Sequence, residues 1–340
     1  MSYTIVLLPG DGIGPEVIAA AQAVLEASEL PARYLSYPIG YACFRREGTA
    51  LPPETLAAVR TADAVLLGAV GSPLERVPGY RSPVVALRRE LELYACLRPV
   101  RTPPLPGARP GVDLVVVREN SEDLYVGQEQ REGDTAVAQR VITREASARI
   151  ARWTAAYAQR QGRRRITLVH KANVLRETCG LFREAALAAL AATPELQVDE
   201  LLVDTAAYQL ARAPERFDVI LTTNLFGDIL SDAASAWGGG LGLAASANLG
   251  ERHAVFEPVH GSAPDIAGRG IANPLATFGA ATLLLEHLGE HARAARLHAA
   301  CQAALRQGVW TPDLGGQATT ADVTRFVIDH LTQPEPAAQL

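Results

Sequence analysis

Short β-branched runs alternate with longer amphipathic stretches along most of the 340-residue chain. Strands are predicted at 4–8, 64–67, 114–117, 166–169, 197–203 and 219–222. Helices are predicted at 14–28, 53–60, 147–161, 178–192 and 225–237, and in the last quarter at 274–288, 291–307 and 321–331. Because strands that alternate with helices usually pair in parallel, the pattern predicts an α/β protein built on parallel strands.

The chain is long enough, and at 48% hydrophobic residues apolar enough, to form two lobes. Five prolines fall within 99–110, which makes this segment a candidate crossing between the lobes. A second crossing is expected near 238–250. The polar segment 127–141 follows a strand-like run and suits an arm or clasp.

Charge and cysteine usage exclude several classes of protein. A net charge of −5 favours neither nucleic acid nor an anionic membrane as a partner. The first residues run directly into Gly10 and Asp11 without the length and cleavage site of a signal peptide, so we expect none. No window holds the roughly 18 apolar residues of a membrane span. The cysteines show no paired spacing, so we expect neither a zinc site nor disulfides. They are Cys43, Cys96, Cys179 and Cys301. We therefore expect a cytoplasmic protein.

The segment Gly-Asp-Gly-Ile-Gly-Pro at 10–15 follows a predicted strand and opens a helix. This position invites a dinucleotide-fingerprint interpretation, but Pro15 stands where the fingerprint needs Gly or Ala. A tight turn with Pro15 in the first helical turn explains the segment without a pyrophosphate. A dinucleotide must then bind elsewhere.

Lys171 is the only lysine among 32 basic residues. Arginine does not release its proton near neutral pH, whereas a desolvated lysine can become a base. Lys171 also follows the predicted strand 166–169, where sites of α/β proteins form. It is therefore a candidate catalytic base, with chance retention as the alternative.

Asp228 and Asp232 are four residues apart in a predicted helix, so both carboxylates project from one face. A hard divalent cation such as Mg²⁺ or Mn²⁺ would relieve their repulsion. Asp204, at the end of a predicted strand, is a candidate third ligand. The alternatives are solvated surface aspartates and, for Asp204, a helix N-cap.

A basic segment runs from 76 to 101 and is otherwise rich in apolar residues. Its arginines are Arg76, Arg81, Arg88, Arg89, Arg98 and Arg101. Arg88, Arg98 and the later Arg118 are candidates to converge on a substrate with two or three carboxylates, because guanidinium groups bind carboxylates in a bidentate manner. Tyr125, near Arg118, is a candidate proton donor. Surface salt bridges and a core tyrosine are the alternatives.

The long loop 257–274 is rich in glycine, proline and other small residues. Such loops are often functional, and small residues permit close backbone approach to a ligand. Asp265 in this loop is a candidate to accept hydrogen bonds from ribose hydroxyls while repelling a 2′-phosphate. A purely structural loop is the alternative.

Six motifs follow one another along the chain: GDGIGPE, LRRELELYACLRP, RENSEDLY, HKAN, NLFGDILSD and HGSAPDIAGRGIANP. In type, order and spacing they resemble the β-decarboxylating dehydrogenase family of isocitrate, isopropylmalate and homoisocitrate dehydrogenases, over essentially the whole chain. The resemblance implies the family's open α/β sheet, not a Rossmann fold. It also implies a larger lobe of residues 1–98 and 249–340 and a smaller lobe of residues 99–248 that carries the dimer interface.

The resemblance implies roles for the candidate residues. Arg88, Arg98 and Arg118 would bind the malate part of the substrate, with Ser72, Ser82, Tyr125, Lys171 and Asn173 as further contacts. Asp204, Asp228 and Asp232 would bind Mg²⁺ or Mn²⁺. Lys171, assisted by Asp204, would accept the hydroxyl proton, and Tyr125 would protonate the enol carbon. The NAD contacts would be Glu257, His260, Gly261, Ser262, Ala263, Asp265, Ile266 and Asn273. Family members are dimers or tetramers in which Lys171 and Asp204 complete the neighbouring subunit's site.

Cofactor and substrate follow from finer comparison with the family. NADP-dependent members carry Lys-Tyr in place of Asp265-Ile266, so we expect NAD. The segment RENSED at 118–123 disfavours isopropylmalate as the substrate. Bacterial isocitrate enzymes carry an asparagine at the position of Val84, so isocitrate is also disfavoured. Segments 79–90 and 311–316 resemble homoisocitrate dehydrogenases best, which predicts formation of 2-oxoadipate in lysine biosynthesis. Isocitrate, isopropylmalate or relaxed specificity remain alternatives, since Val84 and Val85 form an apolar wall.

Two other classes fit less well. Mg²⁺-dependent phosphoryl transfer would explain aspartates with arginines, but the chain has no GxxxxGK[ST] phosphate loop. A nucleotide sensor that had lost its activity would be expected to lack at least one of Tyr125, Lys171, Asp204 and Asp228, and all four are present.

Overall fold

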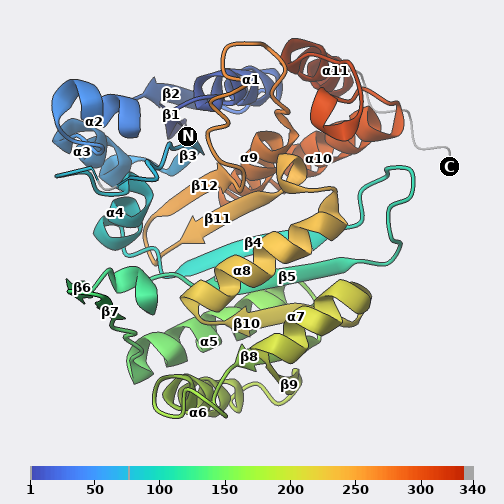
Figure 1. The fold of residues 1–340 in the computed structure, drawn as a ribbon. Coiled ribbons are helices and arrows are strands. Elements are labelled where there is room, and N and C mark those ends of the chain that lie inside the picture. Colours follow the sequence, from blue (N-terminus) through green and yellow to red (C-terminus); the bar gives the residue numbers. More distant parts are fainter. Residues whose placement is uncertain (1, 76, 333–340) are drawn as a thin grey trace, which may run out of the picture.

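A computed structural model describes residues 2–75 and 77–332 of the chain. Arg76 of the basic segment lies outside the described residues. A single 10-stranded sheet runs through the molecule, and helices pack against it (Figure 1). The fold is therefore mixed α/β, as the alternation of strands and helices predicted.

The sheet has two parallel flanks and an antiparallel centre. Its strands are β1 Tyr3–Gly10, β2 Ala32–Ser36, β3 Ala64–Ala69, β4 Ala95–Arg101, β5 Asp113–Glu119, β8 Arg165–His170, β9 Gln197–Leu202, β10 Val219–Thr222, β11 Ala245–Leu249 and β12 Ala254–Pro258. They lie in the order β2-β1-β3-β12-β11-β4-β5-β10-β8-β9. The pairs β12–β11, β11–β4 and β4–β5 are antiparallel, and the others are parallel. The expectation of parallel strands is thus confirmed at the flanks and wrong at the centre.

All eight predicted helices are present, with bounds within about three residues of those predicted. The α-helices are α1 Gly14–Ala27, α2 Tyr41–Glu47, α3 Pro53–Thr61, α4 Pro83–Glu90, α5 Arg144–Arg160, α6 Thr178–Leu190, α7 Val203–Arg212, α8 Asn224–Ser235, α9 Leu275–His287, α10 His291–Arg306 and α11 Thr320–Thr332. Helices α2, α4 and α7 were not predicted.

Successive residues of β5 pack on opposite faces of the sheet. Val115 packs in one apolar cluster with Ile150 of α5, and Val116 packs in another with Leu230 of α8. Helices α5 and α8 therefore cover opposite faces at this point. Figure 1 shows α8 crossing in front of β4 and β5. This arrangement brings the polar residues of α8 over the ends of the central strands.

The boundaries at two predicted elements need correction. The predicted strand 197–203 ends at Leu202, because Val203 is the first residue of α7. The proline-rich segment 99–110 does not begin as a linker, because Pro99 lies within β4 and pairs with Val115. A strand that contains both a charged Arg98 and a proline lacks the apolar alternation by which strands are recognised.

The segment Gly10 to Pro15 forms the predicted tight turn. Gly10 and Gly12 have φ of 77° and 59°, and Pro15 lies in the first turn of α1. The Asp11 carboxylate accepts hydrogen bonds from the backbone N–H groups of Tyr41, Ala42 and Gly71, at 2.7 to 2.8 Å. The turn therefore joins β1 to the first turn of α2 and to the segment after β3. The predicted tight turn with Pro15 in the first helical turn is confirmed.

The segment predicted as an arm contains a two-stranded antiparallel sheet of β6 Glu129–Glu132 and β7 Thr135–Ala138. All eight of these residues are exposed.

Across residues 2–75 and 77–332, no helix is long and apolar enough to cross a membrane. The division into two lobes at residues 98 and 248 stays a prediction.

Candidate active site

A cavity of about 260 Å³ opens beside the antiparallel centre of the sheet. It receives residues from the end of β3, from α4, from β4 and β5, from α8 and from the segment after β12. Its polar lining is Ser72, Ser82, Arg88, Arg98, Arg118, Tyr125, Asp228, Glu257, His260 and Gly261, and its apolar lining includes Val84 and Val85. Segments far apart in the sequence thus meet in one place.

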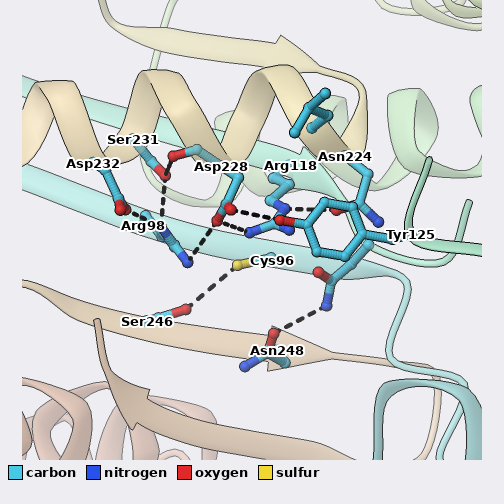
Figure 2. A network of polar contacts seen from close by, with 12 residues as sticks. Cys96, Arg98, Arg118, Tyr125, Asn224, Asp228, Ser231, Asp232, Ser246 and Asn248 are labelled. Atoms are coloured by element: carbon cyan, nitrogen blue, oxygen red, sulfur yellow. Dashed lines mark hydrogen bonds and ion pairs between the residues drawn. The ribbon is translucent and has the colours of Figure 1, made fainter. Parts of the chain in front are cut away.

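Asp228 lies at the centre of the polar network (Figure 2). Its Oδ1 accepts hydrogen bonds from Arg118 Nη1 and, at 3.3 Å, from Arg98 Nη2, and its Oδ2 accepts one from the Tyr125 hydroxyl at 2.6 Å. Burial alone would raise the pKa of Asp228, but the two guanidinium groups and the tyrosine hold it below its ordinary value. The carboxylate is therefore ionised near neutral pH.

Asp232 lies one turn further along α8, as its spacing predicted. Its Oδ1 accepts a hydrogen bond from Arg98 Nη1 at 2.6 Å, and the same nitrogen donates to Ser231 Oγ at 2.8 Å. Burial raises the pKa of Asp232, and the Asp228 charge adds to that effect, while Arg98 opposes it. The two aspartates repel each other, and Arg98 lies between them as the compensating charge.

Tyr125 is held by charged neighbours on two sides. The guanidinium of Arg118 lies 4.7 Å from the centre of the Tyr125 ring, in a cation–π arrangement. Burial, together with the hydrogen bond to Asp228, raises the pKa of the Tyr125 hydroxyl above its ordinary value. The phenol therefore keeps its proton near neutral pH, which suits a proton donor.

The close approach of Arg118 to α8 depends on a glycine. Arg118 is 1% exposed, and its Nε donates to Asn224 Oδ1 at 2.8 Å. A Cβ atom on Gly227 would lie only 2.6 Å from Arg118 Cβ. Gly227 therefore lets the helix pack directly on the arginine that contacts Asp228.

The three predicted substrate arginines each keep a buried N–H group that has no hydrogen-bond partner within residues 2–75 and 77–332. These groups are Arg88 Nε, Arg98 Nε and Arg118 Nη2. Arg88 also lies 3.5 Å from Glu257 Oε1. Buried donors without partners are costly, and an anionic ligand would satisfy them. The cavity is therefore chemically suited to carboxylates.

A buried ion pair supports the 3-10 turn Leu124–Val126 that carries Tyr125. Asp123 is fully buried and pairs with Arg140, whose Nη2 also donates to Thr223 Oγ1 at 2.8 Å. The Asp123 Oδ2 accepts a hydrogen bond from Leu225 N at 3.0 Å. Arg140 and Asp123 thereby join the base of the arm to the first turn of α8.

Lys171 and Asp204 form a separate pair, in which Lys171 Nζ donates to Asp204 Oδ1 at 2.7 Å. They follow β8 and β9, and neither residue lines the cavity. Asn173 is exposed and also lies outside the lining. Across the described parts of the chain, no group of three His, Cys, Asp or Glu side chains is gathered closely enough to hold a metal ion. A single subunit therefore does not bring Asp204 together with Asp228 and Asp232.

The loop 257–274 extends from the cavity to the first turn of α1. Glu257, His260 and Gly261 line the cavity, and the carbonyl oxygen of Ser262 accepts a hydrogen bond from Ile13 N at 2.9 Å. The remaining predicted NAD contacts, Ala263, Asp265, Ile266 and Asn273, lie beyond the lining. Asp265 is exposed, and Ile266 and Ala263 pack against an apolar cluster that contains Ile13. Asn273 donates to Asp313 Oδ2 at 3.0 Å.

Several residues of the site were not predicted. Asn224 and Ser231 position Arg118 and Arg98, and Asn248 donates to Glu257 Oε1 at 2.7 Å. Asn224 and Ser231 stand in the same helical segment as Asp228, which was the available signal. Nothing in the sequence pattern pointed to Asn248, because β11, the strand that carries it, was not predicted.

The sequence profile of the isocitrate/isopropylmalate dehydrogenase family matches residues 4–327. An isocitrate/homoisocitrate dehydrogenase of Thermus thermophilus is 50% identical over 331 residues, covering 97% of this chain and 99% of that protein. A 3-isopropylmalate dehydrogenase of Methanothermobacter thermautotrophicus is 47% identical over 331 residues, with the same coverage. The crystal structure of an isocitrate dehydrogenase from Methylococcus capsulatus has a TM-score of 0.94 at 42% identity, covering 97% of this chain and 100% of that one.

Proposed function

The chain belongs to the isocitrate/isopropylmalate dehydrogenase family, and from this membership we propose that it catalyses the NAD-dependent, divalent-metal-dependent oxidative decarboxylation of homoisocitrate to 2-oxoadipate and carbon dioxide. The observation that carries the proposal is the convergence of Arg88, Arg98 and Arg118 with Tyr125 in one cavity. Three guanidinium groups with unpartnered N–H donors suit a substrate with several carboxylates.

Asp228 and Asp232, with Asp204, would hold Mg²⁺ or Mn²⁺. The residues fit such an ion in their chemistry, because all three offer carboxylate oxygens, the ligands that hard cations prefer. Asp228 and Asp232 lie one helical turn apart and share Arg98 as a counter-charge. The Asp204 side chain is 64% exposed, so it is accessible from outside its own subunit.

The loop 257–274 would bind NAD. Its fit rests on two observations made on the described part of the chain. His260 Nε2 is buried without a hydrogen-bond partner, and a Cβ on Gly261 would meet no atom within 4 Å. Both residues also line the substrate cavity, so a ligand in the loop would reach it. The exposed Asp265 carboxylate would accept hydrogen bonds from ribose hydroxyls and disfavour a 2′-phosphate.

The chain's own residues supply substrate binding and proton transfer. Arg88, Arg98 and Arg118 orient the carboxylates. Lys171, in its neutral and deprotonated form, accepts the hydroxyl proton, with Asp204 as its hydrogen-bond partner. NAD held by the loop 257–274 would supply the hydride acceptor, and a divalent ion held by Asp228, Asp232 and Asp204 would supply positive charge for the substrate oxygen during loss of the β-carboxylate. Tyr125 then donates its proton to the enol carbon. Burial raises the Tyr125 pKa, so the phenol is protonated before this step.

The active site is proposed to need two subunits, in a homodimer or a homotetramer. Within one chain, Lys171 and Asp204 lie outside the cavity that holds Tyr125 and Asp228. Exposed apolar side chains adjoin both parts, since Val174 is 65% exposed and Ile229 of α8 is 58% exposed. A second copy packed on these residues would bury them and bring the lysine pair to the neighbour's cavity.

Homoisocitrate is proposed over the two related substrates for two reasons. The segment 79–90 resembles that of homoisocitrate dehydrogenases, and the polar Ser72 and Ser82 line the cavity. The apolar Val84 and Val85 favour a second candidate, isopropylmalate, or relaxed specificity among the three substrates. The names of the relatives include each of these activities.

Initial rates of NADH formation with Mg²⁺ test the proposal, through kcat/KM for homoisocitrate, isocitrate and isopropylmalate. We expect homoisocitrate to give the highest value, and NADP to replace NAD poorly. A higher kcat/KM for isopropylmalate or isocitrate would reject the homoisocitrate assignment. The absence of NADH formation with all three substrates would reject the activity.

A further inference from the structure

A second cavity, of about 210 Å³, adjoins the substrate cavity. Three residues border both cavities: Val85, Arg88 and Tyr125. The second cavity is otherwise lined by Arg89, Glu92, Asn120, Ser121 and Arg149. It extends away from the network around Asp228, toward α5, which carries Arg149. The proposed reaction assigns no role to this space.

The lining of the second cavity is strongly basic. Arg88, Arg89 and Arg149 contribute three guanidinium groups, against the single carboxylate of Glu92. Within residues 2–75 and 77–332, neither Arg89 nor Arg149 forms an ion pair. Arg149 instead lies 4.2 Å from the centre of the Tyr94 ring and donates to Ser121 Oγ at 3.3 Å. The contacts of its guanidinium group with Ser121 and Tyr94 therefore leave its charge without a paired carboxylate among the described residues.

Two donors in this lining are buried and lack partners. Among the residues that the structure describes, Arg88 Nε and Arg149 Nε have no hydrogen-bond acceptor. A buried N–H of a charged group without an acceptor destabilises the protein, and an anion in the cavity would remove that penalty. Because a guanidinium binds a carboxylate through two parallel hydrogen bonds, a carboxylate is the best-matched anion. The cavity therefore has the chemistry of a carboxylate subsite.

We propose that Arg149 and Arg89 form a specificity subsite that binds the distal carboxylate of the substrate. The inference rests on the proposed function and deepens it. Homoisocitrate carries its third carboxylate one methylene further from the reacting carbons than isocitrate does, and isopropylmalate has an apolar branch instead. Val85, which borders both cavities, leaves a small apolar wall between them. Because Arg88 and Arg149 line the same cavity, a substrate held by Arg88 would direct its distal end toward Arg149.

The test compares Arg149→Gln and Arg89→Gln with the wild type, using kcat/KM for homoisocitrate and for isopropylmalate. Arg152→Gln is the matched control, since Arg152 is exposed on the same helix and does not line the cavity. We expect Arg149→Gln to lower kcat/KM for homoisocitrate by roughly tenfold to a hundredfold, the usual effect of losing a charge-assisted hydrogen bond. Isopropylmalate turnover and the control should stay within about twofold of the wild type.

Two further measurements separate a specificity role from a structural one. Arg149→Lys keeps the charge, and we expect it to recover part of the homoisocitrate activity with an increased KM. Calorimetric titration of homoisocitrate and Mg²⁺ without NAD should show weaker binding in Arg149→Gln, independently of turnover. An equal loss for homoisocitrate and isopropylmalate, with binding unchanged, would overturn the subsite.

The carboxylate could instead belong to a separate small molecule, which glutarate tests. Glutarate is tested as an inhibitor of isopropylmalate turnover by the wild type. If the inhibition is not competitive with isopropylmalate and disappears in Arg149→Gln, the second cavity is a site for a free anion and the proposal is overturned. Competitive inhibition by glutarate supports it. If no family substrate were turned over, the proposed function would fail, whereas loss of homoisocitrate selectivity alone reports on the subsite.

Discussion

At the scale of single residues, the site is a set of charges that compensate one another. Asp228 is ionised because Arg118, Arg98 and Tyr125 all donate to it, while the Tyr125 pKa is raised by burial and by the same carboxylate. The environment thus keeps Asp228 negatively charged and Tyr125 protonated at the same pH. Lys171, the only lysine in the chain, lies outside this network and pairs with Asp204.

Replacing Lys171 by arginine tests its role as the proton acceptor. An arginine at this position would preserve the charge and the ion pair with Asp204, but arginine does not lose its proton near neutral pH. We expect Lys171→Arg to lower kcat by at least about 10²-fold, the scale of general-base catalysis. The measurement is NADH formation with homoisocitrate at saturating NAD and Mg²⁺. Turnover at the wild-type rate would remove Lys171 from the mechanism.

His170 gives a stability prediction that depends on pH. Ala172 N donates to its Nδ1 at 3.2 Å, so the proton is on Nε2, which faces Glu200. Burial lowers the His170 pKa, and Arg183 adds to that shift, while Glu200 opposes it. Since the unfolded chain has a pKa of about 6.5, it binds the proton first as the pH falls. The stability that the neutral ring contributes is complete above that pH and is lost as pH falls toward the lowered pKa.

We therefore expect the free energy of unfolding of the wild type to decrease between pH 7.5 and pH 5.5, and to decrease less in His170→Gln. Urea denaturation at several pH values measures this difference. His291→Gln is the control, because His291 is exposed. An identical pH dependence in the wild type and His170→Gln would contradict the assigned cause.

At the scale of elements, the ends of strands and the start of α8 position the chemistry. The buried pair of Arg140 with Asp123 joins the base of the β6–β7 arm to the turn of Tyr125 and to the first turn of α8. Breaking a buried ion pair leaves an uncompensated charge. The geometry of Tyr125 and Asp228 therefore depends on a residue that does not line the cavity.

We expect Arg140→Met to lower the free energy of unfolding by about 3–5 kcal/mol, because Asp123 would remain buried without its partner. We also expect a lower kcat with a smaller change in KM, since the substrate arginines remain in place. Urea denaturation and steady-state kinetics measure the two effects. Arg131→Gln, on the exposed strand β6, is the control. A stability loss no larger than that of the control would refute this role for Arg140.

Sequence patterns predicted the elements with strong periodicity and missed those without it. Helices such as α1 and α5 were found because their apolar faces repeat with helical spacing. Strand β4 was missed because it holds Arg98 and Pro99, and α7 because it follows β9 without a turn signal. Arg98, which β4 contributes to the candidate site, is also the reason that the strand was not predicted, because a buried arginine interrupts the apolar pattern of a strand.

Within the candidate site, the arginines predicted to converge do line one cavity, because their strands and helix meet at the centre of the sheet. Asp228 and Asp232 share a helix face, as their spacing requires. Supporting residues such as Asn248 could not be predicted, because their contacts join distant segments across the antiparallel strands. Long-range contacts of this kind leave no periodic signal in a single sequence.

At the scale of the whole molecule, the cavity with Tyr125 and the pair of Lys171 with Asp204 are two halves of a proposed site. In the proposed site each half needs the other, because Asp204 pairs with Lys171 and lies outside the cavity that holds Asp228. Exposed apolar residues near both halves, including Val174 and Ile229, favour assembly with a second copy. The oligomer would then be a requirement for catalysis.

Complementation between two inactive variants tests this account most directly. Lys171→Ala and Tyr125→Phe should each be inactive, and subunits mixed under reversible denaturation should form hybrids in which one site has both residues intact. With random pairing, NADH formation from homoisocitrate should recover to about a quarter of the wild-type rate. No recovery above the separate variants, despite hybrid formation shown by mass spectrometry, would contradict an active site shared between subunits.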